Sequence, residues 1–139
     1  MSLDPSLDLQ EAIVQTLRSD PDMNSLVAGR VYDSVKASTT FPYVSVGPDV
    51  VTQDDSSCFE AYDIAVQIDV WSRAKGQPEM KRIAGAVRAA LHNAELALDD
   101  FALVSLQHEI TRYLMDPDGS TNHGVVSLRA LIDGDSVQP

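Results

Sequence analysis

The sequence predicts an α+β fold: an antiparallel β-sheet of about four to five strands with two main helices packed on one face, and a long mobile hairpin arm. Two stretches show helical periodicity, and they lie far apart in the chain. Three stretches, 61–71, 103–114 and 125–132, alternate between apolar and polar residues. The order of helix, strands, helix and hairpin gives a two-layer arrangement.

The 139-residue chain has the size of one domain, and it shows no internal repeat or linker. We therefore expect a single domain over 1–139, with a core over about 7–133 and flexible ends at 1–5 and 134–139. No stretch approaches the roughly 18 apolar residues that span a bilayer, so no membrane partner is expected. The single cysteine, Cys58, excludes an intramolecular disulfide.

The charge balance argues against tight binding of nucleic acid. Lys and Arg number 10 and Asp and Glu number 21, which gives a net charge of −11. Affinity for the phosphate backbone comes largely from its neutralisation by Lys and Arg, and here these residues are scattered from Arg18 to Arg129. The charge is compatible with the wall of a channel to which DNA must not stick.

The first helix is expected over about residues 6–19. Asp4-Pro5 suits a helix start, because the missing N–H of proline costs nothing there. Apolar residues recur at i, i+4 and i+8: Leu9, Ile13 and Leu17. Asp20-Pro21 ends this helix and opens a short second turn, Met23 to Val27, closed by Gly29.

Three strands are expected before the next helix. Residues 30–35 and 41–47 alternate, and Pro42 places the start of the second at a strand end or a sheet edge. The clearest strand is 61–71, with an apolar face of Tyr62, Ile64, Val66, Ile68 and Val70. Its other face is polar and carries Asp63, Gln67 and Asp69. Residues 48–60 are the least regular part and are expected to form the mobile arm.

The second main helix is expected from near Pro78 to about His92, with a stripe of Met80, Ile83, Ala84, Val87 and Leu91. A hairpin should follow. In its first strand one parity carries Val104, Leu106, Ile110 and Leu114, and in its second strand one parity carries Val126, Leu128, Ala130 and Ile132. Asp116-Pro117-Asp118-Gly119 between them has the chemistry of a turn. It does not fit a calcium loop, because Ser127 stands where the twelfth-position Glu would be needed.

Catalytic and metal sites are not indicated. His92, His108 and His123 lack metal-ligand spacing, and no nucleophile or phosphate-binding motif occurs. Asp63 and Asp69 share a strand face roughly 20 Å apart, too far for a catalytic pair. We therefore expect no enzyme, no cofactor and no metal.

Four blocks of the sequence, "GRVYDSV", "FPYVSVG", "DVWSRAKGQPEMKRIAGAVRAAL" and "RYLMDPDGSTNHGVVSLRALI", occur in an order and spacing that resembles one family. This family is the tail-completion, or tail-terminator, proteins of long-tailed phages, prophages and gene transfer agents. The resemblance runs from about Leu9 to Ile132 and includes every block.

The resemblance implies a structural protein of the virion tail, present in the bacterial host cytoplasm during assembly. It implies an antiparallel sheet flanked by helices, and a ring, commonly of six subunits, at the head-proximal end of the tail tube. Such a ring stops tube growth and offers a joining surface to the head connector or stopper protein. DNA passes through its lumen without tight binding.

Two groups of residues are candidates for this role. The arm is expected to contact the tail tube protein or a neighbouring subunit through Val50, Val51, Asp54, Asp55 and Phe59. Acidic residues expected to face the lumen or the ring faces are Asp49, Asp63, Asp69, Asp116 and Asp118.

Two other functions are kept open. A small non-catalytic binding or regulatory domain would use the arm as a ligand lid and would have a concave apolar pocket. A small hydrolase would need two carboxylates within about 5–10 Å of each other.

Overall fold

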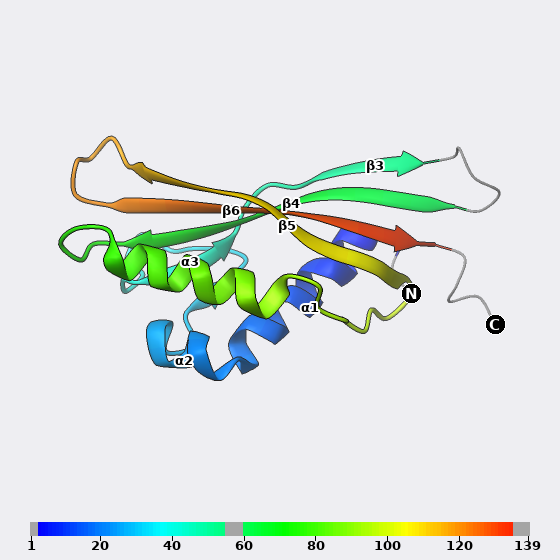
Figure 1. The fold of residues 1–139 in the computed structure, drawn as a ribbon, viewed down its shortest axis with the longest axis horizontal. Helices are drawn as coiled ribbons and strands as arrows, with labels where there is room; N and C mark the ends of the chain where they lie inside the picture. The colour runs from blue at the N-terminus through cyan, green and yellow to red at the C-terminus, as the bar shows by residue number, and fades with distance from the viewer. Residues whose placement is uncertain (1–2, 55–59, 135–139) are drawn as a thin grey trace.

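The structure, a computed structural model, describes residues 3–54 and 60–134, which form three helices and one six-stranded mixed sheet (Figure 1). The helices are α1 (Pro5–Ser19), α2 (Pro21–Val27) and α3 (Pro78–Leu91). The strands are β1 (Val31–Tyr32), β2 (Tyr43–Val46), β3 (Val50–Asp54), β4 (Ala61–Ser72), β5 (Ala102–Met115) and β6 (Asn122–Asp133). The strand order is β1-β2-β4-β6-β5, and β3 pairs with the first half of β4.

The expected α+β class with helices on one face is confirmed, since all three helices lie on the same side of the sheet in Figure 1. The sheet has one strand more than expected, and β1 and β2 run parallel while every other pair is antiparallel. β1 is only two residues long, so the strand expected over 30–35 is much shorter than its alternation suggested.

Helix starts follow the expected chemistry. Asp4 caps α1 by accepting a hydrogen bond from the Ser6 N–H, and Pro5 occupies the first turn. Asp20 ends α1 and caps α2, where its carboxylate accepts the Met23 N–H at 3.0 Å. This shared cap turns the chain sharply, so α2 packs against α1 and α3.

The core is a single layer between the helices and one sheet face. Every residue of the expected α3 stripe is buried, as are Leu9, Ile13 and Leu17 of α1. The sheet contributes the apolar faces of β4 and β6, including Ile64, Val66, Ile68 and Val70 from β4 and Val126, Leu128, Ala130 and Ile132 from β6. Burial of these side chains, each worth about 1.5–3 kcal/mol, fixes which face of the sheet the helices cover.

Two expectations about the strands near the arm need correction. Residues 50–54 are a regular strand, β3, antiparallel to β4, whereas the sequence suggested an irregular segment. All five β3 residues are exposed, whichever face of the sheet they are on. The strand therefore lacks the alternation of apolar and polar residues by which a half-buried strand is recognised. Pro42 directly precedes β2, so the expected position at a strand end is confirmed, whereas β2 is not a sheet edge because it lies between β1 and β4.

The parity expected for the first strand of the hairpin is wrong. Two bulges, between Leu103 and Ser105 and between His108 and Ile110, each shift the register of β5 against β6 by one residue. A shift of one residue moves every following side chain to the other face. As a result Leu106 is buried, but Val104, Ile110 and Leu114 are exposed.

Candidate assembly surface

The exposed large apolar side chains of the sheet gather on two strands that lie on opposite sides of it. β3 carries Val50 and Val51, which are 63% and 40% exposed. β5 carries Val104, Ile110, Tyr113, Leu114 and Met115. Exposed apolar side chains grouped on edge strands are typical of surfaces that another chain covers.

Of the arm residues expected at an interface, the structure brings Val50, Val51 and Asp54 together on β3. Asp55 and Phe59 lie outside the described residues. Val50 is opposite Ala65 and Asp54 is opposite Ala61, so the strand lies along the first half of β4. The arm therefore offers a straight, exposed strand to a partner.

The helix-free face of the sheet carries a buried polar network. Asp69 is 6% exposed, and its Oδ1 lies 2.6 Å from Nε2 of His123 and accepts a hydrogen bond from Nε2 of Gln67 at 2.9 Å. The His123 ring stacks on Trp71 with centroids 3.9 Å apart, and the Trp71 indole N–H donates to Ser45 Oγ. These contacts hold Asp69 inside the protein, in contrast to a carboxylate that projects into a lumen.

The other candidate acidic residues are more accessible. Asp63 Oδ1 lies 3.1 Å from Nε of Arg129, and both side chains are more than one third exposed. Glu109 approaches the same guanidinium at 4.0 Å. Asp49 is exposed just before β3. Asp63 and Asp69 share the helix-free face but have different partners, Arg129 and His123.

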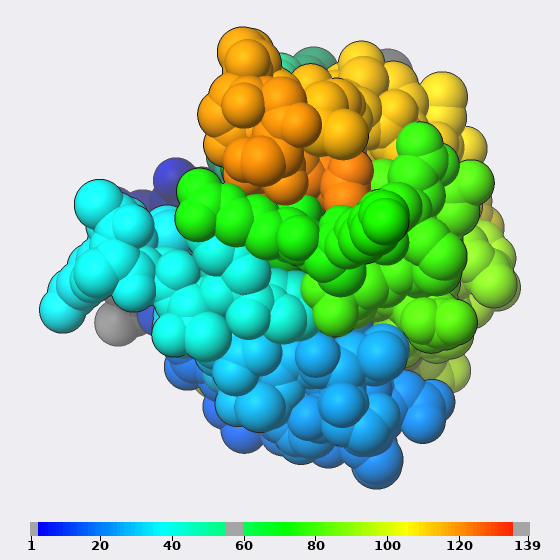
Figure 2. Space-filling model, turned by 90° about the vertical axis from the view of Figure 1, so that its left-hand side faces the viewer, coloured from blue at the N-terminus to red at the C-terminus, as the bar shows by residue number. Residues whose placement is uncertain are grey.

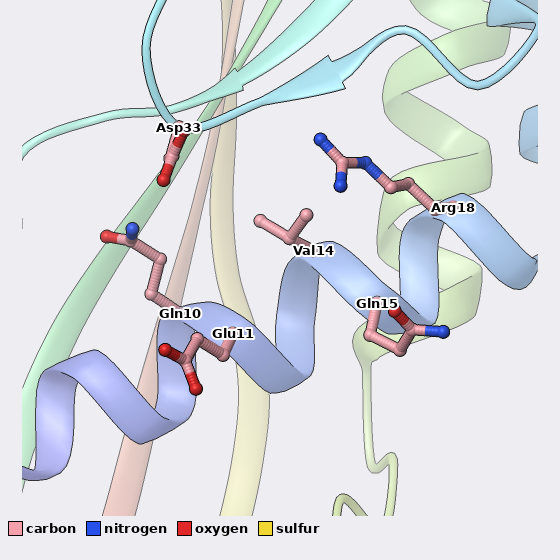
Figure 3. A pocket seen from close by; sticks show the side chains of 6 residues that line it. All are labelled: Gln10, Glu11, Val14, Gln15, Arg18 and Asp33. Atoms are coloured by element: carbon pink, nitrogen blue, oxygen red, sulfur yellow. The ribbon is translucent and has the colours of Figure 1, made fainter. Parts of the chain in front are cut away.

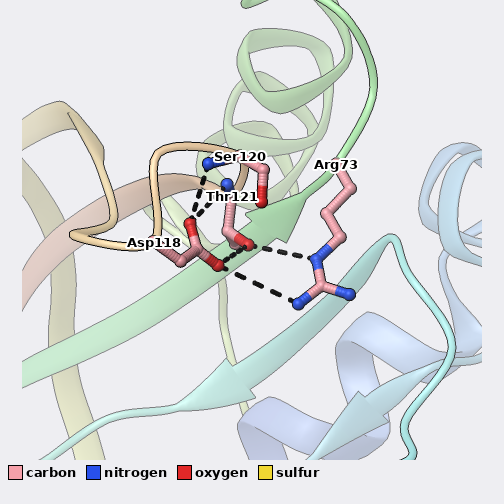
Figure 4. Close-up of polar contacts among 4 residues, drawn as sticks. All are labelled: Arg73, Asp118, Ser120 and Thr121. Atoms are coloured by element: carbon pink, nitrogen blue, oxygen red, sulfur yellow. Dashed lines mark hydrogen bonds and ion pairs between the residues drawn. The ribbon is translucent and has the colours of Figure 1, made fainter.

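The β5–β6 turn behaves as its sequence predicts. Gly119 has φ +76°, and its N–H donates to the Asp116 carbonyl at 2.9 Å. The Asp118 carboxylate accepts hydrogen bonds from the Thr121 hydroxyl and from the Ser120 and Thr121 N–H groups, and Arg73 approaches it at 3.9 Å (Figure 4). These bonds, led by that of the Thr121 hydroxyl, hold the pKa of Asp118 below its ordinary value of 3.8.

The three histidines are far from a metal-binding arrangement. Within residues 3–54 and 60–134, no group of three or more His, Cys, Asp or Glu side chains is placed to hold a metal ion. Nδ1 of His92 accepts the His108 N–H at 3.0 Å, and the His108 ring lies 2.7 Å from the Thr111 hydroxyl. Burial and the nearby positive charge of Arg88 lower the pKa of His108. Both histidines thus take part in structural hydrogen bonds.

Two depressions on the described surface are wide hollows. One, of about 300 Å³, is lined by α1 residues Gln10, Glu11, Val14, Gln15 and Arg18, with Asp33 opposite (Figure 3). Its lining is polar apart from Val14, which is unlike the concave apolar pocket that a ligand-binding domain would need.

A second hollow, of about 440 Å³, lies at the end of the molecule formed by the β5–β6 turn, the loop before α3 and the loop after β1 (Figure 2). Phe41, Tyr43 and Trp71 line it together with Arg73 and Asp118. The Arg73 guanidinium lies 4.2 Å from the Phe41 ring centroid. Burial raises the pKa of Tyr43.

None of the described helices is long and apolar enough to cross a membrane. The fold and surface together define a class of protein: a small α+β domain whose distinguishing features are exposed strands and whose polar clusters are structural. Such features are those of a protein that assembles with other chains.

Comparison with known proteins makes this class specific. The family described as tail completion protein gp17 matches residues 11–133. The tail completion protein gp17 of Bacillus phage SPP1 is 26% identical over 125 residues, which cover 90% of this chain and 92% of that protein. The chain belongs to the family of tail completion proteins and is a structural component of the tails of phages and phage-like particles.

Solved structures agree with the family. A chain of the virion of a native gene transfer agent particle has a TM-score of 0.88 and 29% identity, over 96% of this chain and 100% of that chain. The structure of the gp17 protein of bacteriophage SPP1 has a TM-score of 0.61 and 27% identity, over 90% of this chain and 88% of that chain. The resemblance first indicated by four sequence blocks is therefore confirmed.

Sequence reasoning missed two features of this surface. The alternation predicts one apolar parity along the whole of β5, whereas the register of its second half depends on bulges that leave no clear sign in the pattern. The Asp69–His123 pair joins residues 54 positions apart, so no local motif reveals it.

Proposed function

We propose that this protein closes the head-proximal end of a tail tube as a ring, most simply of six copies, and so ends tube growth. Its partners are then further copies of itself, the tail tube protein, and the head–tail connector or stopper protein. Membership of the tail completion family supports a position at the end of the tail. The closed ring is what we propose beyond membership of this family.

The observation that carries the proposal is the exposed β3 strand. Val50 and Val51 project from a strand whose five residues are all exposed, although they pair with a buried strand, β4. An isolated chain gains little from exposing apolar side chains on an edge, whereas a subunit of a ring covers them against a neighbour.

The charge supports a lumen through which DNA passes. The net charge of −11 repels the phosphate backbone. The candidates for the lumen or the ring faces are Asp49 and Asp118, which are exposed, and Asp63 and Asp116, which are half-buried. Asp69 was also a candidate from the sequence, but its carboxylate is hydrogen-bonded to His123 and Gln67. The proposed ring needs no catalysis and no cofactor, and the whole chain acts in it as one domain.

The first experiment is the solution mass of the purified protein, measured by light scattering over a wide range of concentration. A closed ring near six subunits is the expected result. A monomer at every concentration, together with tails that assemble to normal length without this protein, would overturn the proposal. Over-long or open-ended tubes in its absence, seen by electron microscopy, would support it.

A further inference from the structure

The edges of the sheet differ in how the chain protects them. On one side the edge is formed by β1 and β3, and on the other side by β5. An edge strand presents N–H and C=O groups that pair readily with another chain, so proteins commonly cover such edges. An edge that the chain leaves uncovered therefore indicates where another chain is expected to bind.

The β1 edge is covered by α1. Nε and Nη2 of Arg18 donate to the Val31 carbonyl at 3.0 and 2.6 Å. The side chain reaches from the last turn of the helix and occupies an acceptor that a neighbouring strand would otherwise use.

The first half of β5 is covered by the chain that follows α3. The Asn93 N–H donates to the Leu106 carbonyl at 2.8 Å, and the His108 N–H donates to Nδ1 of His92 at 3.0 Å. Farther along, Ala97 forms a bridge with Ala102. These bonds block the outer edge of β5 as far as His108.

Two edge segments carry no such cover among the described residues: Val50–Thr52 of β3 and Arg112–Met115 of β5. Both carry exposed apolar side chains, Val50 and Val51 on one and Tyr113, Leu114 and Met115 on the other. Figure 1 shows the arrowhead end of β5 at the margin of the sheet, and in the strand order β5 and β3 lie on opposite sides of β4.

We propose that these two edges bind each other: β3 of one copy pairs with Arg112–Met115 of the next copy. The inference names the contact surfaces of the ring and rests on the proposed function. Two different edges on opposite sides of one sheet give a head-to-tail contact, which is the kind that closes a ring.

The pairing is antiparallel. β3 is antiparallel to β4, β4 to β6 and β6 to β5, so β3 and β5 run in opposite directions. When the sheet continues from one copy into the next, these two strands meet antiparallel.

Within β3 and Arg112–Met115 themselves the charged residues differ in sign, although Asp116 follows the β5 segment. Arg112 lies on β5, and Nζ of Lys81 lies 5.2 Å from the centroid of the Tyr113 ring beside it. β3 carries Asp54 and follows Asp49, and its range contains no Lys or Arg. Opposite charges facing each other favour this partner and disfavour β3 with β3 or β5 with β5. A second copy is therefore the occupant for which the edges are suited.

The proposed contact sets the tilt of the strands once Thr52 of one copy is placed opposite Tyr113 of the next. Thr52 is level with Asp63 of β4, and Tyr113 is level, through Gly124, with Val70. This offset of seven positions is about 23 Å at strand rise, and the four strand spacings per copy are about 19 Å. The strands would then incline by about 50° to the ring axis, close to the tilt of about 35–45° in closed barrels.

The test is cross-linking with paired cysteines in a Cys58→Ser background. Thr52→Cys and Tyr113→Cys are placed in the same chain, and tails are assembled with this variant as the sole source of the protein. The free protein at ring-forming concentration is treated in parallel. The matched control replaces Tyr113→Cys by Gln107→Cys, which is exposed on the covered half of the same strand.

We expect oxidation to give a ladder of covalent oligomers for the Thr52 and Tyr113 pair and little or none for the Thr52 and Gln107 pair. Each single-cysteine variant should stay uncross-linked, since the contact joins unlike edges. Equal ladders for both pairs, dimers from one single variant, or a bond from Thr52→Cys to another tail protein would overturn the inference. A ring seen by light scattering without the ladder would overturn it as well, while leaving the proposed function intact.

Discussion

Asp69 and His123 lie 2.6 Å apart on the helix-free face of the sheet, and Asp69 is nearly inaccessible to solvent. The pair joins β4 to β6, and Trp71 stacks on the histidine beside it. A face of a sheet without helices is usually polar and wet, whereas here its centre is a closed hydrogen-bonded cluster. Replacing a member of the cluster should therefore affect folding before it affects assembly.

The first prediction concerns this pair. Asp69→Ala leaves His123 and Gln67 without their acceptor in a buried setting, so we expect a loss of about 1–3 kcal/mol in the free energy of unfolding. The matched control is Asp63→Ala, whose ion pair with Arg129 is exposed and worth about 1 kcal/mol or less. Denaturant unfolding measures both. Equal losses in the two variants would contradict a structural role for Asp69.

The second prediction concerns Gly47, which packs against the same cluster. A Cβ at this position would lie 2.5 Å from Oδ2 of Asp69 and 3.0 Å from Nε2 of Gln67. Both side chains are held by hydrogen bonds, so Gly47→Ala should destabilise the fold by about 1–3 kcal/mol. Gly85→Ala on α3 is the control, because nothing lies within 4 Å of its Cβ.

In that control, alanine in a helix interior should raise the free energy of unfolding by about 0.5–1 kcal/mol relative to glycine. The two Gly→Ala changes therefore have opposite expected signs. A stabilised Gly47→Ala variant would contradict this prediction, because it would show that the Asp69 and Gln67 side chains move aside at little cost.

These residues also show how far the sequence predicts the structure. The helices and β4 were placed correctly, because each has one buried face and its apolar period continues without a break. β3 is not evident in the sequence because no face of it is buried, and only two residues of the alternating stretch 30–35 form β1. The error in β5 came from two bulges, each of which reverses the parity that follows.

The candidate surface was predictable only in part. Val50 and Val51 stand out in a polar segment, and the structure does place them on an exposed strand. The acidic candidates were chosen by charge alone, and charge does not reveal burial, which is why Asp69 was grouped with exposed residues such as Asp49. Partners from distant strands, such as His123 for Asp69, follow from register and not from spacing.

The third prediction concerns β3. Val50→Ser and Val51→Ser together should change the free energy of unfolding by about 0.5 kcal/mol each at most, since both side chains are already exposed. Ring formation, measured by light scattering, should nevertheless weaken, because the apolar area covered between subunits is lost. Leu7→Ser on α1, where Leu7 is 49% exposed, should leave the ring unchanged. An unaltered ring in the β3 variant would remove β3 from the interface.

The fourth prediction concerns pH and the β5–β6 turn. The pKa of Asp118 is lowered in the folded protein, so its contribution to stability is present above its ordinary value of 3.8 and is lost as the pH falls through the lowered folded value. Asp118→Ala should therefore lower the melting temperature at pH 7, and the difference from the native protein should shrink toward pH 2, where the carboxyl is neutral.

Asp118→Asn is the matched variant for this turn, because an amide oxygen can accept the Ser120 and Thr121 N–H groups without a charge. Its melting temperature should lie between those of the native protein and Asp118→Ala at pH 7. A difference between native protein and Asp118→Ala that stays constant from pH 7 to pH 2 would contradict the assigned cause.

The last prediction concerns the passage of DNA. Asp49→Lys combined with Asp63→Lys reverses two accessible charges, and DNA should then adhere where it previously slid. Folding should persist, because the Asp63–Arg129 pair is exposed and contributes little.

The measurement is DNA delivery per particle, with particles counted by electron microscopy so that assembly and delivery are separated. Asp22→Lys on α2, away from the sheet, is the control of equal chemistry. Delivery slowed in the double variant and normal in the control is expected, because like charges keep a channel wall from binding its cargo. Normal delivery from particles that contain the double variant would show that these two carboxylates do not line the path of the DNA.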